Sequence, residues 1–275
     1  MKDYKCIKII CPPDVQELML AAVDEDDFEV YEQTDEALLC YLPEEKLTDE
    51  KLKGIETLIH SFGWHYEISN IPYKNWNEAW EQNFEPIRVD DFVGVRAEFH
   101  KAFDNVRFDL VINPKMAFGT GHHETTYQMM EMMQTIDFKA KSVLDYGCGT
   151  GILGILAAKL SAAIIEGNDI TEESIENTIE NCSINKVDNF TVSLGKLDLY
   201  DGKVFDIILA NINRNVLLES ANALFQNMSH DGHLLTSGYM PEDQTLIEEC
   251  YTEAGFRMES MTQKAYWLCH HWVKQ

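Results

Sequence analysis

The sequence predicts an α/β protein in which a domain with a seven-stranded, mostly parallel sheet follows a small ferredoxin-like α+β domain. Residues 142–169 read as strand, glycine-rich turn, helix, strand and final acid, the local order of a nucleotide-binding half-sheet. Strand and helix patterns then alternate as far as residue 273. Residues 5–71 show the element order βαββαβ of a ferredoxin-like module.

The composition is that of a globular protein. The chain has 275 residues, of which 45% are hydrophobic and 25% charged, enough for two domains. No apolar run approaches the roughly 18 residues that cross a membrane. Seven cysteines without a CxxC pair suit reduced thiols better than disulfides or a zinc site. We therefore expect a cytoplasmic protein without a membrane partner.

The formal net charge of −25 is the strongest bulk signal. It argues against tight binding to bare nucleic acid, where neutralisation of phosphates supplies the affinity. A basic protein substrate would be attracted to such a surface. Solubility alone could also explain the charge, and the charge does not choose between these two explanations.

The first domain is expected to span residues 1–72. Its strands are predicted at 5–11, 28–32, 37–42 and 64–71, and its helices at 15–23 and 49–62. Asp14 is a candidate N-cap of the first helix, and Gly63 closes the second. This domain carries no catalytic cluster, so we expect it to recognise a partner.

Residues 73–99 are interpreted as a linker with a short helix at 75–84. Trp76 and Trp80 lie one turn apart on this helix. A pair of aromatic rings that seals two domains explains them, and so does a border of the substrate path.

Residues 113–126, with the sequence NPKMAFGTGHHETT, lead into a helix predicted at 127–136. Thr125 and Thr126 at the helix N-terminus can donate hydrogen bonds to a carboxylate. A helix cap with its leading turn explains one threonine, but not the whole AFGTG run. His122 and His123 could suggest a metal ion, but further ligands are not evident nearby, and we predict no metal.

The glycine turn at 147–151 permits close approach of the backbone to a ligand. Asp169, at the tip of the following strand, can accept hydrogen bonds from ribose hydroxyls. Residues 149–154 also satisfy the dinucleotide fingerprint GxGxxG, which alone is a weak signal. Asp145, two residues before the first glycine, instead resembles the first motif of S-adenosylmethionine (AdoMet) methyltransferases.

The rest of the chain continues the α/β pattern. Strands are predicted at 190–194, 205–213, 233–237, 256–262 and 266–273, and helices at 171–181, 215–227 and 242–254. The last two strands should form a hairpin that closes the sheet. Asn211 ends the apolar run of the buried strand 205–213, and ligands collect at the carboxyl ends of parallel strands. Cys269, His270 and His271 adjoin one another, but neighbouring strand residues point to opposite faces and cannot easily share a metal ion.

Together these motifs resemble one family. AFGTGHHETT, LDYGCGTGILGILAAKLSA, GND and LANI, in this order and spacing, are similar to the bacterial ribosomal-protein methyltransferase PrmA family. The resemblance is close from about residue 76 onward, and over the first 72 residues it depends on element order and length. It implies a seven-stranded, Rossmann-like AdoMet-dependent methyltransferase domain at residues 100–275, a substrate-recognition domain before it, and large-subunit ribosomal protein eleven as substrate.

The resemblance also implies site residues. These are AdoMet contacts at Thr126, Gly147, Asp169 and Asn211. The glycine turn and the loop before the helix add Thr120, Gly121, Asp145 and Gly149 as further predicted cofactor contacts. Our own hypothesis makes Asn211 and Phe118 the catalytic residues. The Asn211 side-chain oxygen, or nearby backbone carbonyls, would accept hydrogen bonds from the amine, and Phe118 would form a wall of the methyl-transfer pocket. His122 and Glu124 stand where the family commonly has threonine and proline, which could alter substrate fit.

The leading hypothesis is thus a monomeric, AdoMet-dependent protein N-methyltransferase acting on α-amino or lysine ε-amino groups. An AdoMet enzyme with another protein or a small molecule as substrate is a second hypothesis. An NAD-binding oxidoreductase that uses GxGxxG is a third, and a non-catalytic ribosome-associated binder is a fourth.

Overall fold

The computed structural model divides the chain into two compact units, Met1–Asn83 and Phe84–Gln275. It describes residues 4–12, 16, 30–34, 36–61, 63–71, 85–113 and 123–274. The helix predicted at 75–84 and most of the helix predicted at 15–23 lie outside the described residues.

The first unit contains a four-stranded antiparallel sheet in the order β2-β3-β1-β4. Its described elements are β1 (Tyr4–Ile10), β2 (Val30–Gln33), β3 (Ala37–Pro43), α2 (Asp49–Ser61) and β4 (His65–Ile71). Ile7, Leu38 and Ile59 are fully buried in its core. This strand order is the one expected for a ferredoxin-like module.

The second unit is built on a seven-stranded sheet in the order β10-β9-β8-β11-β12-β14-β13. Its strands are β8 (Ser142–Tyr146), β9 (Ile164–Asp169), β10 (Phe190–Leu194), β11 (Phe205–Asn211), β12 (Met228–Tyr239), β13 (Phe256–Lys264) and β14 (Trp267–Lys274). The pairs β10–β9, β9–β8, β8–β11 and β11–β12 are parallel. Strand β14 pairs antiparallel with both β12 and β13. The predicted fold class and closing hairpin are confirmed.

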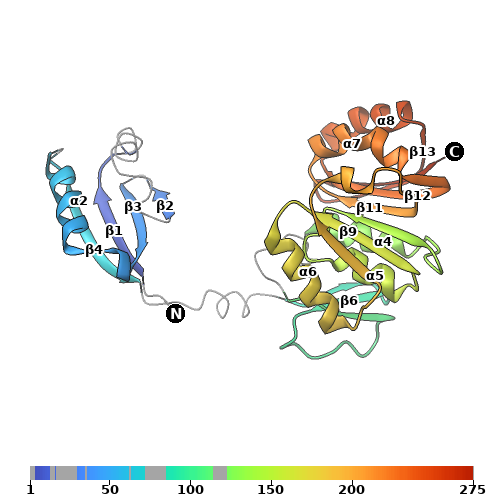
Figure 1. Ribbon diagram of the computed structural model, residues 1–275, viewed down its shortest axis with the longest axis horizontal. Helices are drawn as coiled ribbons and strands as arrows, with labels where there is room; N and C mark the ends of the chain where they lie inside the picture. Colours follow the sequence, from blue (N-terminus) through green and yellow to red (C-terminus); the bar gives the residue numbers. More distant parts are fainter. Residues whose placement is uncertain are drawn as a thin grey trace. The chain divides into compact units, whose positions relative to one another are not determined.

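Helices cover both faces of this sheet (Figure 1). They are α4 (Glu124–Met133), α5 (Ile152–Lys159) and α6 (Glu172–Asn185) on one face, and α7 (Arg214–Gln226) and α8 (Gln244–Glu253) on the other. Consecutive strand residues alternate between the two cores: Ile207 and Leu209 face α4 and α5, whereas Ile208 and Ala210 face α7. Burial on both faces explains why the strands read as continuous apolar runs.

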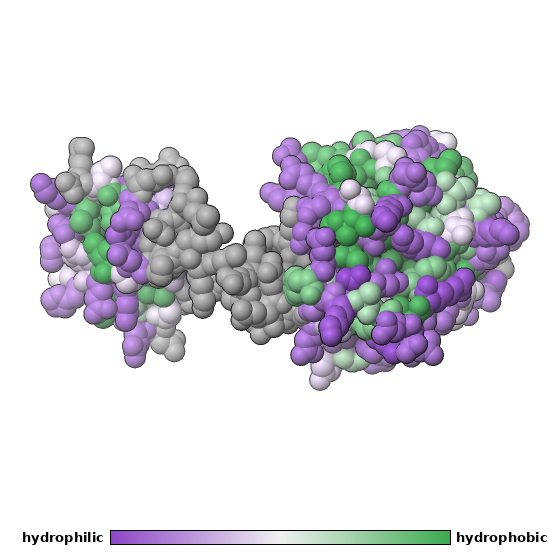
Figure 2. Space-filling model, turned by 90° about the horizontal axis from the view of Figure 1, so that it is seen from below, coloured by the Kyte–Doolittle hydropathy of each residue, from purple (hydrophilic) through white to green (hydrophobic). Residues whose placement is uncertain are grey.

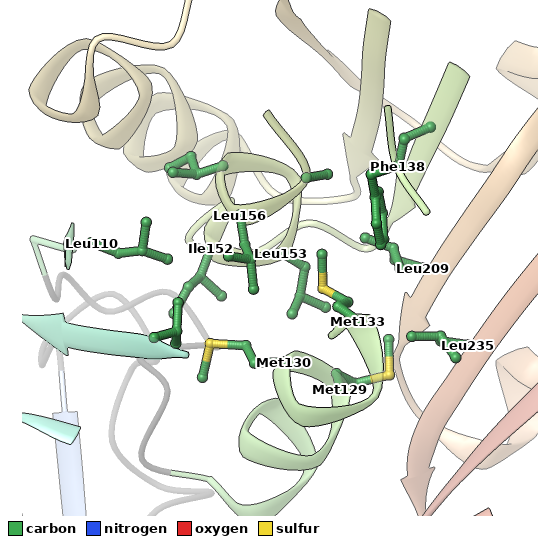
Figure 3. Packing of buried hydrophobic residues seen from close by; sticks show 14 of the residues in the cluster. Leu110, Met129, Met130, Met133, Phe138, Ile152, Leu153, Leu156, Leu209 and Leu235 are labelled. Atoms are coloured by element: carbon green, nitrogen blue, oxygen red, sulfur yellow. The ribbon is translucent and has the colours of Figure 1, made fainter. Parts of the chain in front are cut away.

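The core beneath α4 and α5 is rich in methionine (Figure 3). Met129, Met130 and Met133 of α4 are fully buried. In Figure 3, Met129 and Met133 lie between Leu153 of α5 and Leu235 of β12, and Met130 lies on the side of Ile152. This packing fixes the N-terminus of α4 at the edge of the sheet where β8 and β11 end.

Several details differ from the sequence-based expectation. Residues 87–96 fall in the range predicted as a linker, yet they form β5 (Ile87–Val89) and β6 (Val93–Arg96), which join β7 (Phe108–Val111) in a small sheet. Val93 and Val95 alternate with polar or small neighbours too briefly to predict a strand, but both are fully buried. The domain boundaries remain a prediction.

Other differences concern element bounds. Helix α4 begins at Glu124, three residues before its predicted start, and β11 ends at Asn211, two residues before its predicted end. Helix α6 continues to Asn185, four residues beyond the predicted end, because Lys186 supplies the left-handed C-cap at φ 56°. Strand β12 begins at Met228, since Phe205 of β11 pairs with Met228 before a register shift.

The surface of the second unit is mixed. On the face in Figure 2, hydrophobic residues form patches between hydrophilic ones. Ile170 is a large exposed hydrophobic residue, at 71%. It follows directly on Asp169, so an apolar side chain is accessible beside that carboxylate.

Candidate active site

Three adjacent strands, β9, β8 and β11, bring the predicted residues to one edge of the sheet. Asp169 ends β9, Gly147 follows β8 and Asn211 ends β11. Because these strands are parallel, their carboxyl ends meet at the same edge. Residues 22 or more positions apart in the sequence therefore converge there.

The glycine turn is tied to the neighbouring strand. Gly147, Gly149 and Gly151 have φ angles of +74°, +56° and +77°, which favour glycine. The N–H groups of Gly147 and Cys148 both donate to the Asn168 carbonyl at 2.9 Å. The turn is thereby held at the tip of β9.

The Asp169 carboxylate connects the turn to helix α6. One oxygen accepts from the Gly149 N–H at 3.0 Å. The other accepts from the N–H and hydroxyl of Thr171, the N-cap residue of α6, at 3.2 and 3.3 Å. The side chain is only partly buried. A rigidly placed carboxylate at this position suits the recognition of vicinal hydroxyls.

Asp145 has a different environment. Its side chain is buried, and its Oδ2 accepts from the Gly154 N–H in the first turn of α5 at 2.9 Å. Burial raises the pKa of this carboxyl to about 7, the Gly154 N–H opposes the shift, and repulsion from Asp169 adds to it. The structure thus gives Asp145 a contact with α5; contact with a cofactor stays a prediction.

Asn211 and Thr126 are in direct contact. The Asn211 Nδ2 donates to the Thr126 hydroxyl at 3.1 Å. The Asn211 Oδ1 is buried and has no hydrogen-bond partner within the described parts of the chain. A buried acceptor without a partner costs about 1–3 kcal/mol, so such atoms are characteristic of functional sites. This oxygen is suited to receive an N–H group.

The loop before α4 carries the other predicted residues. Phe118, Thr120, Gly121 and His122 lie outside the described residues. His123 is the N-cap of α4, and its Nδ1 accepts from the Thr125 N–H. Its ring meets that of Trp267 edge-on at 4.7 Å.

Sequence comparisons agree with this geometry. The family model described as "Ribosomal protein L11 methyltransferase (PrmA)" matches residues 14–275. The chain belongs to this family. Relatives named ribosomal protein L11 methyltransferase are 39% identical in Porphyromonas gingivalis, covering 91% of this chain and 88% of that one, and 35% identical in Phocaeicola vulgatus, covering 94% and 93%.

A solved structure of a PrmA-family protein has the same fold. The ribosomal protein L11 methylase from Lactobacillus delbrueckii subsp. bulgaricus superposes with a TM-score of 0.64 at 26% identity, covering 70% of this chain and all of that one. The predicted family, enzyme class and AdoMet cofactor are confirmed, and the oxidoreductase alternative is not favoured. Among the helices of the described residues, none is long and apolar enough to span a membrane.

Two features of this site were not predicted from the sequence. The first is the start of β14, where the Trp267 carbonyl accepts from the Gln128 Nε2 at 3.2 Å. These residues are 139 positions apart, and local patterns carry no signal for such a contact. The second is a buried face of α6 with asparagines at positions 177, 181 and 185. Their spacing by four was a usable signal, although the predicted helix ended at 181.

The three neighbouring residues on β14 separate as expected for a strand. His270 Nδ1 contacts the Tyr239 hydroxyl at 2.8 Å, whereas His271 Nε2 contacts His233 Nδ1 at 3.0 Å. Cys269 packs against Met129 and Met132. The described residues contain no group of three or more potential ligands that could hold a metal ion.

The shifted pKa of Asp145 predicts a pH-dependent stability. The carboxyl titrates near pH 3.8 when unperturbed and at about 7 when folded, so folded protein retains a proton that unfolded chains release. The retained proton on Asp145 stabilises the folded protein fully below pH 3.8, and this stabilisation is lost as the pH rises through 7. The Asp145→Asn variant keeps an acceptor for Gly154 but does not titrate. Relative to this variant, the wild type should lose about 2 to 3 kcal/mol of unfolding free energy between pH 5 and pH 8.

Urea denaturation of both proteins at pH 5, 6, 7 and 8 measures this difference. A difference in unfolding free energy that stays constant over the range would show that Asp145 remains ionised throughout.

Proposed function

We propose that this protein transfers methyl groups from AdoMet to amino groups of ribosomal protein L11. The relatives in Porphyromonas gingivalis and Phocaeicola vulgatus are named ribosomal protein L11 methyltransferase, which supports the substrate. The unpartnered Asn211 Oδ1 is the observation that carries the proposal, because an amine needs an acceptor for its N–H group at the point of transfer.

The residues at the sheet edge fit AdoMet. The Asp169 carboxylate would accept from the ribose hydroxyls, and the exposed Ile170 beside it offers an apolar contact for the purine. The turn at Gly147 and Gly149 would lie under the amino-acid part of the cofactor. When bound, the cofactor supplies an already activated methyl group.

The protein then has to present a neutral amine. A free α-amino group has a pKa of about 7.7–8.0 and a lysine about 10.4, so both arrive largely or partly protonated. Burial of the amine beside Asn211 disfavours the charged form. Thr126 holds the Asn211 amide by its nitrogen, which leaves the oxygen to accept from the amine and fix its direction. We place Phe118 at the wall of this pocket.

The net charge of −25 is compatible with a basic protein substrate. Complementary charge accelerates encounter and orients the partner before contact. We assign recognition of L11 to the first unit, Met1–Asn83, since the proposed cofactor and amine contacts all belong to the second.

A labelled-methyl assay tests both parts of the proposal. The full chain and a chain beginning at residue 84 are each incubated with labelled AdoMet and purified L11, and the label is located by mass spectrometry. The full chain should label amines of L11, and the shortened chain should bind AdoMet but label L11 poorly. Absence of label from L11 with the full chain would contradict the substrate assignment, and equal labelling by both chains would contradict the role of the first unit.

A further inference from the structure

Helix α6 buries a face of amide and hydroxyl side chains, which we name the α6 polar face: Asn177, Thr178, Asn181 and Asn185. The first three are 0% exposed and Asn185 is 6% exposed. Three of the four are spaced by four residues, so they share one side of the helix. Burial of a polar group is unfavourable unless it is hydrogen-bonded. The partners of these side chains therefore indicate what the α6 polar face does.

One set of partners is the glycine turn. The Thr178 hydroxyl donates to the Gly149 carbonyl at 2.9 Å. The Asn181 Nδ2 donates to the Thr150 carbonyl, also at 2.9 Å. The contact is tight, since a Cβ built on Gly151 would lie 2.6 Å from the Thr178 methyl carbon. Carbonyl groups of the turn are thus fixed from the side of α6.

The other set of partners is the chain leading away from β7. The Asn113 N–H donates to the Asn181 Oδ1 at 2.8 Å, and the Asn177 Nδ2 donates to the Asn113 carbonyl at 3.2 Å. Asn185 accepts from the Val111 N–H at 3.0 Å and donates to the Val111 carbonyl at 2.6 Å. Residues 111–113 are the last described part of the chain before His123.

Within the described ranges, Asn181 is the one member of the α6 polar face whose hydrogen bonds reach both sides. Its amide nitrogen holds the glycine turn and its amide oxygen holds Asn113. We infer that Asn181 is a positioning residue for methyl transfer: it sets the cofactor-binding turn relative to Asn113, at the end of the described segment 85–113. This inference rests on the proposed function.

Loss of the Asn181 side chain should do more than lower the stability of the fold. If its bonds only stabilise the fold, loss of any asparagine on this face should act alike. If it positions the turn, its loss should weaken the cofactor site specifically. Asn185 is the matched control, because it is the same residue type, equally paired and on the same face, but bonds to Val111 and not to the turn.

The test uses the full chain with substitutions Asn181→Ala, Thr178→Val and Asn185→Ala. For each, urea denaturation gives stability, calorimetry gives the AdoMet dissociation constant, and labelled transfer to L11 gives kcat and KM. We expect Asn181→Ala to weaken AdoMet binding about tenfold and to lower kcat at saturating AdoMet about tenfold. Changes of this size correspond to the loss of one or two hydrogen bonds. Asn185→Ala should lose stability but change the AdoMet dissociation constant less than twofold.

Thr178→Val keeps the side-chain shape and removes the bond to Gly149, so it serves where Asn181→Ala does not fold. It should weaken AdoMet binding at least threefold with little change in KM for L11. AdoMet dissociation constants for Asn181→Ala or Thr178→Val that match Asn185→Ala would overturn the inference. Wild-type protein that neither binds AdoMet nor labels L11 would instead contradict the proposed function, so the two failures are distinguishable.

Discussion

Replacing Asn211 by alanine is expected to lower kcat for methyl transfer by about 10- to 100-fold, with a smaller change in AdoMet affinity. The Asn211 Oδ1 is buried without a described partner, and Thr126 fixes the amide that carries it. The substrate amine that Asn211 would bind is charged in one of its protonation states. Hydrogen bonds to charged groups contribute about 1.5–3 kcal/mol, which corresponds to a 10- to 100-fold change in rate. Steady-state kinetics at saturating AdoMet measures the effect.

Asn213→Ala is the matched control for Asn211. Asn213 lies two residues further on, and its side chain accepts from the Asn215 N–H at 2.9 Å as the N-cap of α7. Its loss should cost about 1 kcal/mol of stability and leave kcat within about threefold of the wild type. Equal kcat values for the two variants would remove Asn211 from the transfer step.

Replacing Asp169 by alanine is expected to raise the AdoMet dissociation constant by at least about 100-fold. The variant would lack the proposed contact with the ribose hydroxyls. It would also lack the hydrogen bonds that the Asp169 carboxylate accepts from the N–H groups of Gly149 and Thr171. Each charge-assisted bond contributes roughly 1.5–3 kcal/mol, and two of them exceed the energy of a 100-fold change. Calorimetric titration with AdoMet measures the effect.

Glu166→Gln on the same strand provides the comparison. Glu166 pairs with Lys203 at 2.5 Å, and no described contact links it to the glycine turn. This variant should bind AdoMet within about twofold of the wild type. If Glu166→Gln weakens binding as much as Asp169→Ala, loss of negative charge from the strand, not a specific contact, would explain the result.

The order of the elements in the second unit could be predicted because a polar residue stands at or near the end of three buried strands. Asp145, Asp169 and Asn211 each follow an apolar run, and the parallel sheet brings such ends together. Sequence patterns failed where contacts are distant or elements short. Strands β5 and β6 have three and four residues, and their buried valines belong to the same hydrophobic core as residues of α4 and α5.

The acidic and amide residues of the candidate site could be predicted from the sequence. The residues that hold them in place, such as Asn181, could not. The motif positions of Asp169 and Asn211 are local signals, whereas the bonds of Asn181 to Asn113 and Thr150 cross 68 and 31 residues. The direction of the Asp145 carboxylate also depends on tertiary structure, since its acceptor geometry is set by where α5 begins.

A crystal structure with S-adenosylhomocysteine tests the central claim most directly. The account predicts ligand density at the ends of β8 and β9, with the ribose hydroxyls within hydrogen-bond distance of the Asp169 carboxylate and the sulfur facing the Asn211 side chain. Density at another edge of the sheet, or at this edge with Asn211 turned away from the sulfur, would contradict it.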